Sequence, residues 1–384
     1  MAILHSIYLR KLGFDVELFY GGPLHPDWKK RVHQNIPLKS LPFGFPPSVK
    51  RLRSIEKLKQ YLKSFDVILV HHHICPFLAF YLTIFLKPKL VWYCGEPLRA
   101  LWENWVSGMN YRELSCTVKQ TSIESYGRLS TSVFLSGKLY DFAIYFLRTL
   151  NKVTANHYTK IIANSNYTKK VIKRIYGLKK SIPVVYPGVE TQRHTQNSTS
   201  EELDGYILAV GAMIPMKNHL NLLRAFHSLP REHQTKVKLV IIGSGPLEKE
   251  IRSLARKLNL KNVVFQSRVS EQRLNKYYAN CSFVVHVALS EPFGLVPVEA
   301  ALHGKPSIVS NDGGTLEVVI HGETGLIVNP YDPKDIADAM EYLIKDKKRT
   351  AEMGFKAKER ASKEFTIESS TENLARALAA AMQK

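Results

Sequence analysis

The second half of the chain alternates short apolar runs with stretches of helical spacing, and this alternation constrains the fold more than any other feature. Each run has the length and apolar content of a buried strand. Strands joined by crossover helices form a parallel sheet that is covered on both faces. The sequence therefore predicts a doubly wound α/β domain. Its predicted strands are Tyr206–Val210, Val237–Ile242, Val263–Gln266, Phe283–Val287, Ser307–Ser310 and Gly325–Val328.

A strand, a short loop and a helix follow one another between residues 283 and 304. Phe283–Ala288 is apolar and rich in β-branched residues, and LVPVEAALHG is a helical pattern that stops at Gly304. Glu291 lies in the loop at the carboxyl end of the strand, where open α/β sheets bind ligands, and Glu299 lies roughly two turns into the helix. The first N–H groups of this helix, those of Gly294 and the two residues after it, are free to bind a phosphate.

The two glutamates belong to a longer motif. The segment from Glu291 to Ala300 reads E-P-F-G-L-V-P-V-E-A. It resembles E-x-F-G-L-x-x-x-E-A, the hallmark of retaining, nucleotide-sugar-dependent glycosyltransferases of the GT-B fold, in glycosyltransferase family 4 or the "glycosyl transferases group 1" type. The alternative is an ordinary loop and helix with two solvated glutamates, which does not account for Phe293, Gly294 and Leu295 in the same register.

The resemblance implies an α/β fold of the GT-B type, with two Rossmann-like doubly wound domains that face each other across a cleft. We expect an acceptor-side domain over 1–189, a polar linker over 190–205 and a nucleotide-sugar domain over 206–364. A final helix over 365–384 is expected to cross back to the first domain. The resemblance also implies a strand and a glycine-rich loop before the helix predicted at Ala2–Leu12, so the first domain is predicted to be incomplete at its start. A strand is predicted over Asp15–Phe19, and a strand and a turn over Ile182–Gly188.

Two loops of the second domain match donor-binding loops of the family. The segment from Gly211 to Lys217 resembles G-R-L-x-x-x-K, in which arginine and lysine hold the nucleotide diphosphate; Lys217 matches and Ala212 replaces the arginine. Gly243 and Gly245 match the family's G-x-G-P, whose backbone approaches the nucleotide. The alternatives are a surface lysine and a tight turn between a strand and a helix.

The resemblance also assigns roles to these residues. Glu291 is expected to bind hydroxyls of the donor hexose and to stabilise positive charge at its anomeric carbon, while Glu299 binds the ribose. Lys217 and the backbone amides of Phe293, Gly294 and Leu295 are expected to hold the departing diphosphate. The sequence contains no D-x-D motif for a divalent metal, so we expect no metal and no cofactor.

The acceptor side is predicted from fewer residues. The strand over Lys89–Cys94 precedes Gly95, which stands where many family members have a histidine. Glu96 and Arg99 are either acceptor contacts or structural ion-pair partners. The three histidines at 71–73 end a predicted strand, and alternate side chains of a strand point to opposite faces. A loop or core role is therefore expected for them, and no metal site.

The positive charge is concentrated in the first half of the chain. The sequence carries 54 Lys and Arg against 33 Asp and Glu, a net charge of +21. Residues 1–200 contribute 29 against 11, or +18. Such a field favours an anionic membrane surface or another polyanion. Residues 49–65 form a basic amphipathic pattern, which is either a domain helix with a solvated face or a membrane-surface patch. No RRM, KH or helix-turn-helix signature supports nucleic-acid binding.

Compartment signals agree with a cytoplasmic protein that is peripheral on the inner face of a membrane. No secretory signal is visible, and the longest apolar run of the first half, Pro76–Leu86, is too short to span a bilayer. The four cysteines show no C-x-x-C spacing, which indicates reduced thiols. They are Cys75, Cys94, Cys116 and Cys281.

The functional expectation is a retaining, metal-independent hexosyltransferase. It would move a hexose, mannose or glucose, from a nucleotide diphosphate sugar to a lipid-linked or polysaccharide acceptor. The alternative is a non-catalytic, degenerate GT-B subunit that binds a nucleotide sugar. The predicted incompleteness of the first domain and Ala212 motivate that alternative.

Overall fold

A computed structural model describes residues 1–20, 36–40, 60–71, 90–96, 137–191 and 205–383. These residues divide into two units. Unit 2 contains the described residues from Val189 to Thr366, and unit 1 contains those before and after them. Most of the basic segment 49–65, together with His72, His73 and Arg99, lies outside the described residues.

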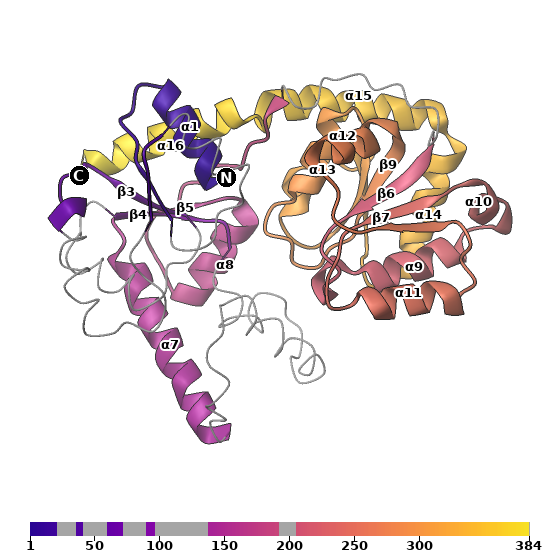
Figure 1. The fold of residues 1–384 in the computed structure, drawn as a ribbon, viewed down its shortest axis with the longest axis horizontal. Helices are drawn as coiled ribbons and strands as arrows, with labels where there is room; N and C mark the ends of the chain where they lie inside the picture. The colour runs from indigo at the N-terminus through magenta and orange to yellow at the C-terminus, as the bar shows by residue number, and fades with distance from the viewer. Residues whose placement is uncertain (21–35, 41–59, 72–89, 97–136, 192–204, 384) are drawn as a thin grey trace. The chain divides into compact units, whose positions relative to one another are not determined.

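Unit 2 is built on a six-stranded parallel sheet with the order β11-β10-β9-β6-β7-β8 (Figure 1). All six predicted strands are confirmed, four of them with the predicted bounds. The strands are β6 (Tyr206–Val210), β7 (Leu239–Ile242), β8 (Val263–Gln266), β9 (Cys281–His286), β10 (Ser307–Ser310) and β11 (Gly325–Val328).

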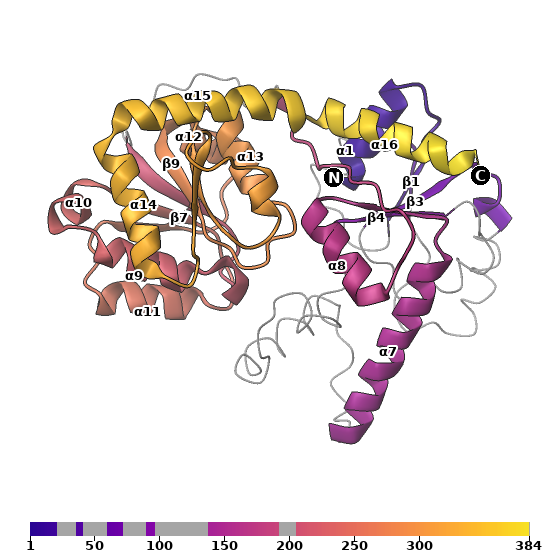
Figure 2. The same ribbon diagram turned by 180° about the vertical axis from the view of Figure 1, so that it is seen from behind.

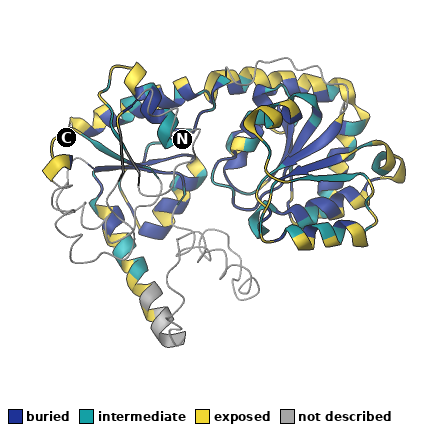
Figure 3. Cartoon of the chain, in the orientation of Figure 1, coloured by how far each residue is buried: buried dark blue, intermediate teal, exposed yellow. Residues whose placement is uncertain are grey.

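Helices cover both faces of this sheet, because successive strand residues point to opposite sides. Ile207 packs into a core shared with α9, α11 and α14, whereas Leu208 packs into one shared with α12 and α13. The strands are accordingly buried and the outer helix surfaces exposed (Figure 3). The helical segments are η2 (Pro215–Lys217), α9 (His219–Ser228), α10 (Arg231–Lys236), α11 (Glu248–Lys257), α12 (Glu271–Asn280), α13 (Leu295–Leu302), η3 (Gly314–Glu317), α14 (Pro333–Lys345) and α15 (Lys347–Glu364).

Unit 1 contains a parallel sheet of order β3-β4-β5 and a separate parallel pair, β1 and β2. The strands are β1 (Leu18–Tyr20), β2 (Leu38–Ser40), β3 (Ile68–His71), β4 (Leu90–Cys94) and β5 (Lys160–Ala163). The helices are α1 (Ala2–Lys11), α7 (Gly137–His157), α8 (Asn166–Tyr176) and α16 (Ile367–Met382).

The C-terminal helix α16 packs against α1 at the other end of the sequence, and the two lie side by side in both views (Figures 1 and 2). His5 Nε2 lies 2.9 Å from Ser370 Oγ, which in turn donates to the carbonyl of Tyr186. Leu374 and Leu378 enter a core with Val91 and Ile162 of the sheet.

Two predictions for unit 1 were wrong in detail. The strand expected over Asp15–Phe19 is β1, which begins at Leu18 because its partner β2 begins at Leu38 and the two pair in register. The segment Ile182–Gly188, expected as a strand and a turn, is extended and has a single bridge, between Ala163 and Val184. Pro183 and Pro187 flank that bridge, and proline has no N–H to extend a ladder.

Within the described part of the chain, no helix combines the length and the apolar character that a membrane span requires.

Candidate functional site

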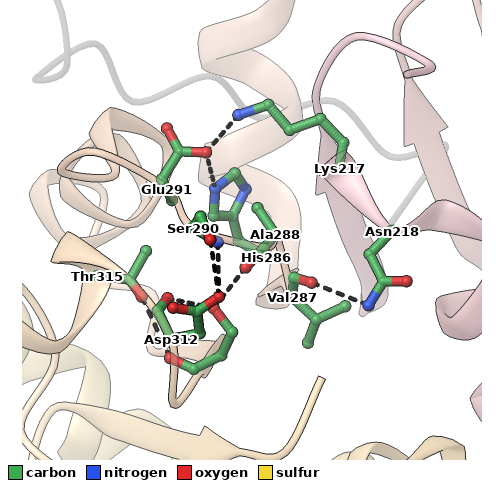
Figure 4. Close-up of polar contacts among 10 residues, drawn as sticks. Lys217, Asn218, His286, Val287, Ala288, Ser290, Glu291, Asp312 and Thr315 are labelled. Atoms are coloured by element: carbon green, nitrogen blue, oxygen red, sulfur yellow. Dashed lines mark hydrogen bonds and ion pairs between the residues drawn. The ribbon is translucent and has the colours of Figure 1, made fainter. Parts of the chain in front are cut away.

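The candidate site lies in unit 2, where the loops after β6, β9 and β10 come together. These three strands are neighbours in the sheet, so their carboxyl ends meet at one edge. This is the edge at which open α/β sheets bind ligands. The loops bring together Lys217 from the first, Glu291 from the second and Asp312 from the third (Figure 4).

The loop after β6 is fixed by Asn218. This residue adopts a left-handed conformation with φ 58°, which asparagine tolerates better than most residues. Its Nδ2 donates to the carbonyls of Val287 (3.2 Å) and Pro330 (2.7 Å). Asn218 therefore ties the loop that carries Lys217 to the loop after β9.

The loop after β9 is fixed by the loop after β10. Ser290, itself at φ 51°, donates its backbone N–H and its hydroxyl to Asp312 Oδ2, at 2.8 and 3.1 Å. The N–H of Gly314 donates to the carbonyl of Glu291 at 2.6 Å. A Cβ at Gly313 would lie 2.6 Å from the same carbonyl oxygen, so the approach requires glycine. The backbone of Glu291 is thus held on a rigid support.

The side chain of Glu291 lies between a lysine and a histidine. Lys217 Nζ donates to its Oε2 at 2.5 Å, and His286 Nε2 lies 3.5 Å from the same oxygen. Burial acts to raise the pKa of Glu291, but His286 and Lys217 outweigh it and hold that pKa well below its usual range. Glu291 is therefore ionised at neutral pH, which is the charge state that its expected role requires.

Two buried histidines accompany this ion pair. Burial, opposed by Glu291, lowers the pKa of His286, and burial lowers the pKa of His219 to about 4. Both imidazoles are neutral in this state of the protein.

Glu299 is the fifth residue of α13 and lies in a different environment. Tyr278, fully buried on α12, donates its hydroxyl to Glu299 Oε2 at 2.7 Å. The ring of His303 stacks on Tyr278 at 5.4 Å. Burial raises the pKa of Glu299 to about 7, although the hydrogen bond from Tyr278 opposes that rise. This carboxyl group is therefore poised between its neutral and charged forms at neutral pH.

The start of α13 has the backbone geometry of an anion site. Gly294 is the N-cap residue at φ 105°, and no side chain caps the helix. The side chain of Phe293 is buried and packs edge-to-face on Phe365 at 5.6 Å, whereas Leu295 is exposed. The side chain of Phe293 therefore anchors the loop, and only its backbone is available for the predicted donor contact.

The two loops predicted to bind the donor approach each other closely at Gly243 and Gly245. A Cβ at Gly243 would lie 1.9 Å from the carbonyl oxygen of Gly211, and one at Gly245 would lie 2.5 Å from that of Met213. Gly243 and Gly245 thus have a packing requirement that is independent of any nucleotide.

The acceptor-side residues are only partly described. Glu96 follows β4 in unit 1, and Arg99 falls outside the described residues. Of the two roles expected for His71, in a loop or in the core, its packing fits the core, because its ring lies against those of His5 (5.3 Å) and Tyr93 (5.0 Å). Among the described residues there is no group of three or more side chains able to hold a metal ion.

Sequence reasoning missed His286 and Tyr278 as parts of the site, and it assigned no role to the side chain of Asp312. A histidine at the end of an otherwise apolar strand was a signal for His286, since burying an imidazole requires compensation. Tyr278 and Asp312 reach their partners only through the tertiary fold.

Two family models match the chain. "Glycosyl transferases group 1" matches residues 190–360, and "Glycosyltransferase Family 4" matches residues 4–193. The D-rhamnosyltransferase WbpZ of Pseudomonas aeruginosa is 34% identical over 231 residues, which are 58% of this chain and 57% of that protein. The alpha-1,3/1,6-mannosyltransferase ALG2 of Dictyostelium discoideum is 27% identical over 252 residues, with 56% and 59% covered. The match spans just over half the length of these relatives.

Solved structures show the same fold. HepE of Anabaena, in complex with UDP and glucose, has a TM-score of 0.71 at 20% identity, covering 99% of this chain and 96% of that one. The sucrose-phosphate synthase of Thermosynechococcus elongatus has a TM-score of 0.68 at 19% identity, covering 98% and 92%. The predicted α/β fold of the GT-B type is thereby confirmed. With both family models matched and the E-P-F-G-L motif at the carboxyl edge of the sheet, the chain belongs to the family 4, group 1 type of GT-B glycosyltransferases.

Proposed function

We propose that this protein is a retaining hexosyltransferase that uses a nucleotide diphosphate sugar, with mannose or glucose as the transferred hexose. The observation that carries the proposal is the contact between Lys217 and Glu291 at the carboxyl ends of β6 and β9. It brings a cation for a diphosphate and an ionised carboxylate for a sugar into one site. Two relatives support this chemistry, one named a D-rhamnosyltransferase and the other a mannosyltransferase. The structural neighbour in complex with UDP and glucose supports it as well.

In this proposal the site stabilises the charges that develop as the glycosidic bond breaks. Positive charge appears at the anomeric carbon, and Glu291 is ionised to stabilise it. Negative charge appears on the leaving diphosphate, and Lys217 with the N–H groups at the start of α13 would bind it. The acceptor attacks from the side of the leaving group, which retains configuration. The diphosphate oxygen takes the acceptor's proton, so no separate base is required.

The proposed reaction needs no metal ion and uses a lipid-linked or polysaccharide acceptor. Lys217 and the start of α13 would do the work that a divalent cation does elsewhere, so EDTA should leave the rate unchanged. The excess of positive charge in residues 1–200 favours a lipid-linked or polysaccharide acceptor at an anionic membrane surface, reached from the cytoplasm.

The test is transfer of labelled sugar from a panel of GDP- and UDP-hexoses into a membrane lipid extract, with EDTA present. Wild-type protein should give product from one donor. Glu291→Gln should lower turnover by roughly two to three orders of magnitude, the usual effect of removing one charge-stabilising group. Glu359→Gln, at an exposed position on α15, is the matched control and should retain wild-type turnover. Undiminished transfer by Glu291→Gln would refute the site.

Ala212 favours the second candidate, a non-catalytic nucleotide-sugar-binding subunit, because it removes one of the two cations expected at the diphosphate. That candidate predicts nucleotide binding with no product from any donor in the panel. Lys217→Gln should weaken nucleotide binding under both candidates, by roughly tenfold or more for one charge-assisted contact.

A further inference from the structure

His286 shares a carboxylate oxygen with the lysine of the donor site. It is the last residue of β9 and its side chain is 4% exposed. Its Nε2 lies 3.5 Å from Glu291 Oε2, the oxygen that also accepts from Lys217 (Figure 4). At that distance the neutral imidazole lies beside the carboxylate without the geometry of a hydrogen bond.

The ion pair between Lys217 and Glu291 has to open for the proposed function to operate. Lys217 has to reach a diphosphate, and Glu291 has to face the hexose. The carboxylate is then left with little exposure to water, since its side chain is 14% exposed here. A buried carboxylate that loses its partner is strongly destabilised. Among the described residues, His286 is a positively chargeable group that stays in contact with it.

The charge state of His286 depends on three neighbours besides the solvent. Lys217 from η2 disfavours the protonated imidazole, whereas Glu291 and the backbone of Val210 favour it. His219 on α9 is a further titratable neighbour within the described part of the chain, and burial lowers its pKa to about 4, so it is neutral. Withdrawal of Lys217 removes the charge that disfavours the protonated imidazole and leaves the two interactions that favour it, those with Glu291 and with the backbone of Val210. The arriving diphosphate adds negative charge to the same site.

We propose that His286 takes up a proton from solvent when a nucleotide diphosphate draws Lys217 away from Glu291, and that the imidazolium then holds the Glu291 carboxylate toward the hexose. His286 is a positioning residue, since it acts through Glu291 and touches no reacting atom. The inference rests on the proposed function for its diphosphate site. In the protonated state Nε2 donates to Oε2, so the 3.5 Å contact shortens to a charge-assisted hydrogen bond.

The first measurement needs no turnover. Binding of UDP and of GDP is followed by calorimetry at pH 7 in two buffers of different ionisation enthalpy, which reports the number of protons taken up. Wild-type protein should take up a fraction of one proton with the nucleotide that binds. His286→Gln should take up none at an affinity within about tenfold of wild type, because Lys217 still reaches the diphosphate. His219→Gln is the matched control for loss of a buried imidazole beside the same site, and it should retain the uptake.

The second measurement separates positioning from packing. The donor-saturated rate of wild-type protein should fall as the pH rises through the donor-bound pKa of His286, where the imidazolium loses its proton. In His286→Gln this alkaline fall should be absent and kcat should be roughly ten- to a hundredfold lower, with KM for the donor changed much less. Side-chain ¹⁵N NMR of wild-type protein gives the same answer without a variant: one buried imidazole should become protonated on nucleotide addition.

The outcomes are distinguishable. Nucleotide binding without proton uptake, or uptake that persists in His286→Gln, overturns the role of His286 and leaves the proposed donor site standing. Failure of both nucleotides to bind overturns the donor site and the role of His286 with it. Uptake confined to proteins that retain His286 supports both.

Discussion

Glu299→Gln should make unit 2 more stable at alkaline pH while weakening nucleotide binding. The wild-type carboxyl is buried beside Tyr278 and its pKa is raised from 4.5 to about 7. A group with a raised pKa stabilises the folded state below its unfolded pKa, and that stabilisation is lost as the pH rises through the folded pKa. Glutamine does not titrate, and its side-chain oxygen still accepts from the Tyr278 hydroxyl. The variant therefore removes the cost of burying the charge and keeps the packing.

The magnitude follows from these two pKa values. Between pH 5 and pH 8 the wild-type free energy of unfolding should fall, relative to Glu299→Gln, by about 2.5 kcal/mol. Residual hydration of the carboxyl makes this an upper estimate. The expected nucleotide affinity is lower in the variant, because an uncharged amide is a weaker acceptor for ribose hydroxyls.

Urea unfolding at pH 5 and pH 8, followed by circular dichroism, measures the effect. All four tryptophans lie within the first 105 residues, so tryptophan emission identifies the transition of unit 1 and leaves the other transition to unit 2. Glu359→Gln, an exposed change on α15, should show no pH-dependent difference from wild type. If Glu299→Gln behaves like that control, the burial argument is refuted.

Three further predictions concern the support of the site. Gly243→Ala should destabilise unit 2 by about 1–3 kcal/mol and lower its Tm, since the added Cβ meets the carbonyl of Gly211. Ser228→Ala, at an exposed position on α9, is the control and should leave the Tm unchanged. An unchanged Tm in Gly243→Ala would contradict the packing argument. Asn218→Ala should cost about 1–3 kcal/mol, because it removes the hydrogen bond from Asn218 to the carbonyl of Val287 and one of the two amide donors to the carbonyl of Pro330, the other being Asn221. It should lower turnover as well; thermal unfolding and the transfer assay measure the two effects. Lowering the pH from 7 to 5 should destabilise unit 2, because the buried His219, with its pKa lowered to about 4, stays neutral while an unfolded histidine is protonated. His219→Gln should reduce that loss of stability by roughly 2 kcal/mol, as measured by urea unfolding at the two pH values. If the ring were solvated, wild type and His219→Gln would lose the same stability.

The parallel sheet of unit 2 was predictable because its strands are short, apolar and punctuated by turns. Strand pairing in unit 1 was less predictable, since it depends on residues far away in the sequence. Leu18 begins a strand only where Leu38 pairs with it, and the segment after Ile182 forms a single bridge because prolines flank it.

In the site, too, the local features could be predicted from the sequence and the long-range contacts could not. The segment from Glu291 to Glu299 was identified from its own residues, because the loop and helix that present it are local. The contact of His286 with Glu291 depends on the loop after β10, which holds the backbone of Ser290 and Glu291, and that of Tyr278 with Glu299 depends on α12 packing against α13. Neither geometry follows from spacing alone. The pKa shifts of Glu291 and Glu299 therefore depend on the tertiary structure.

The packing of α16 on α1 has a consequence for synthesis on the ribosome. The core of unit 1 includes Leu9 near the start of the chain and Leu374 and Leu378 near its end. Unit 2, by contrast, is complete once the residues up to Thr366 have emerged. The core of the first unit therefore cannot be completed until α16 has been synthesised, whereas the core of the second needs no residue beyond Thr366.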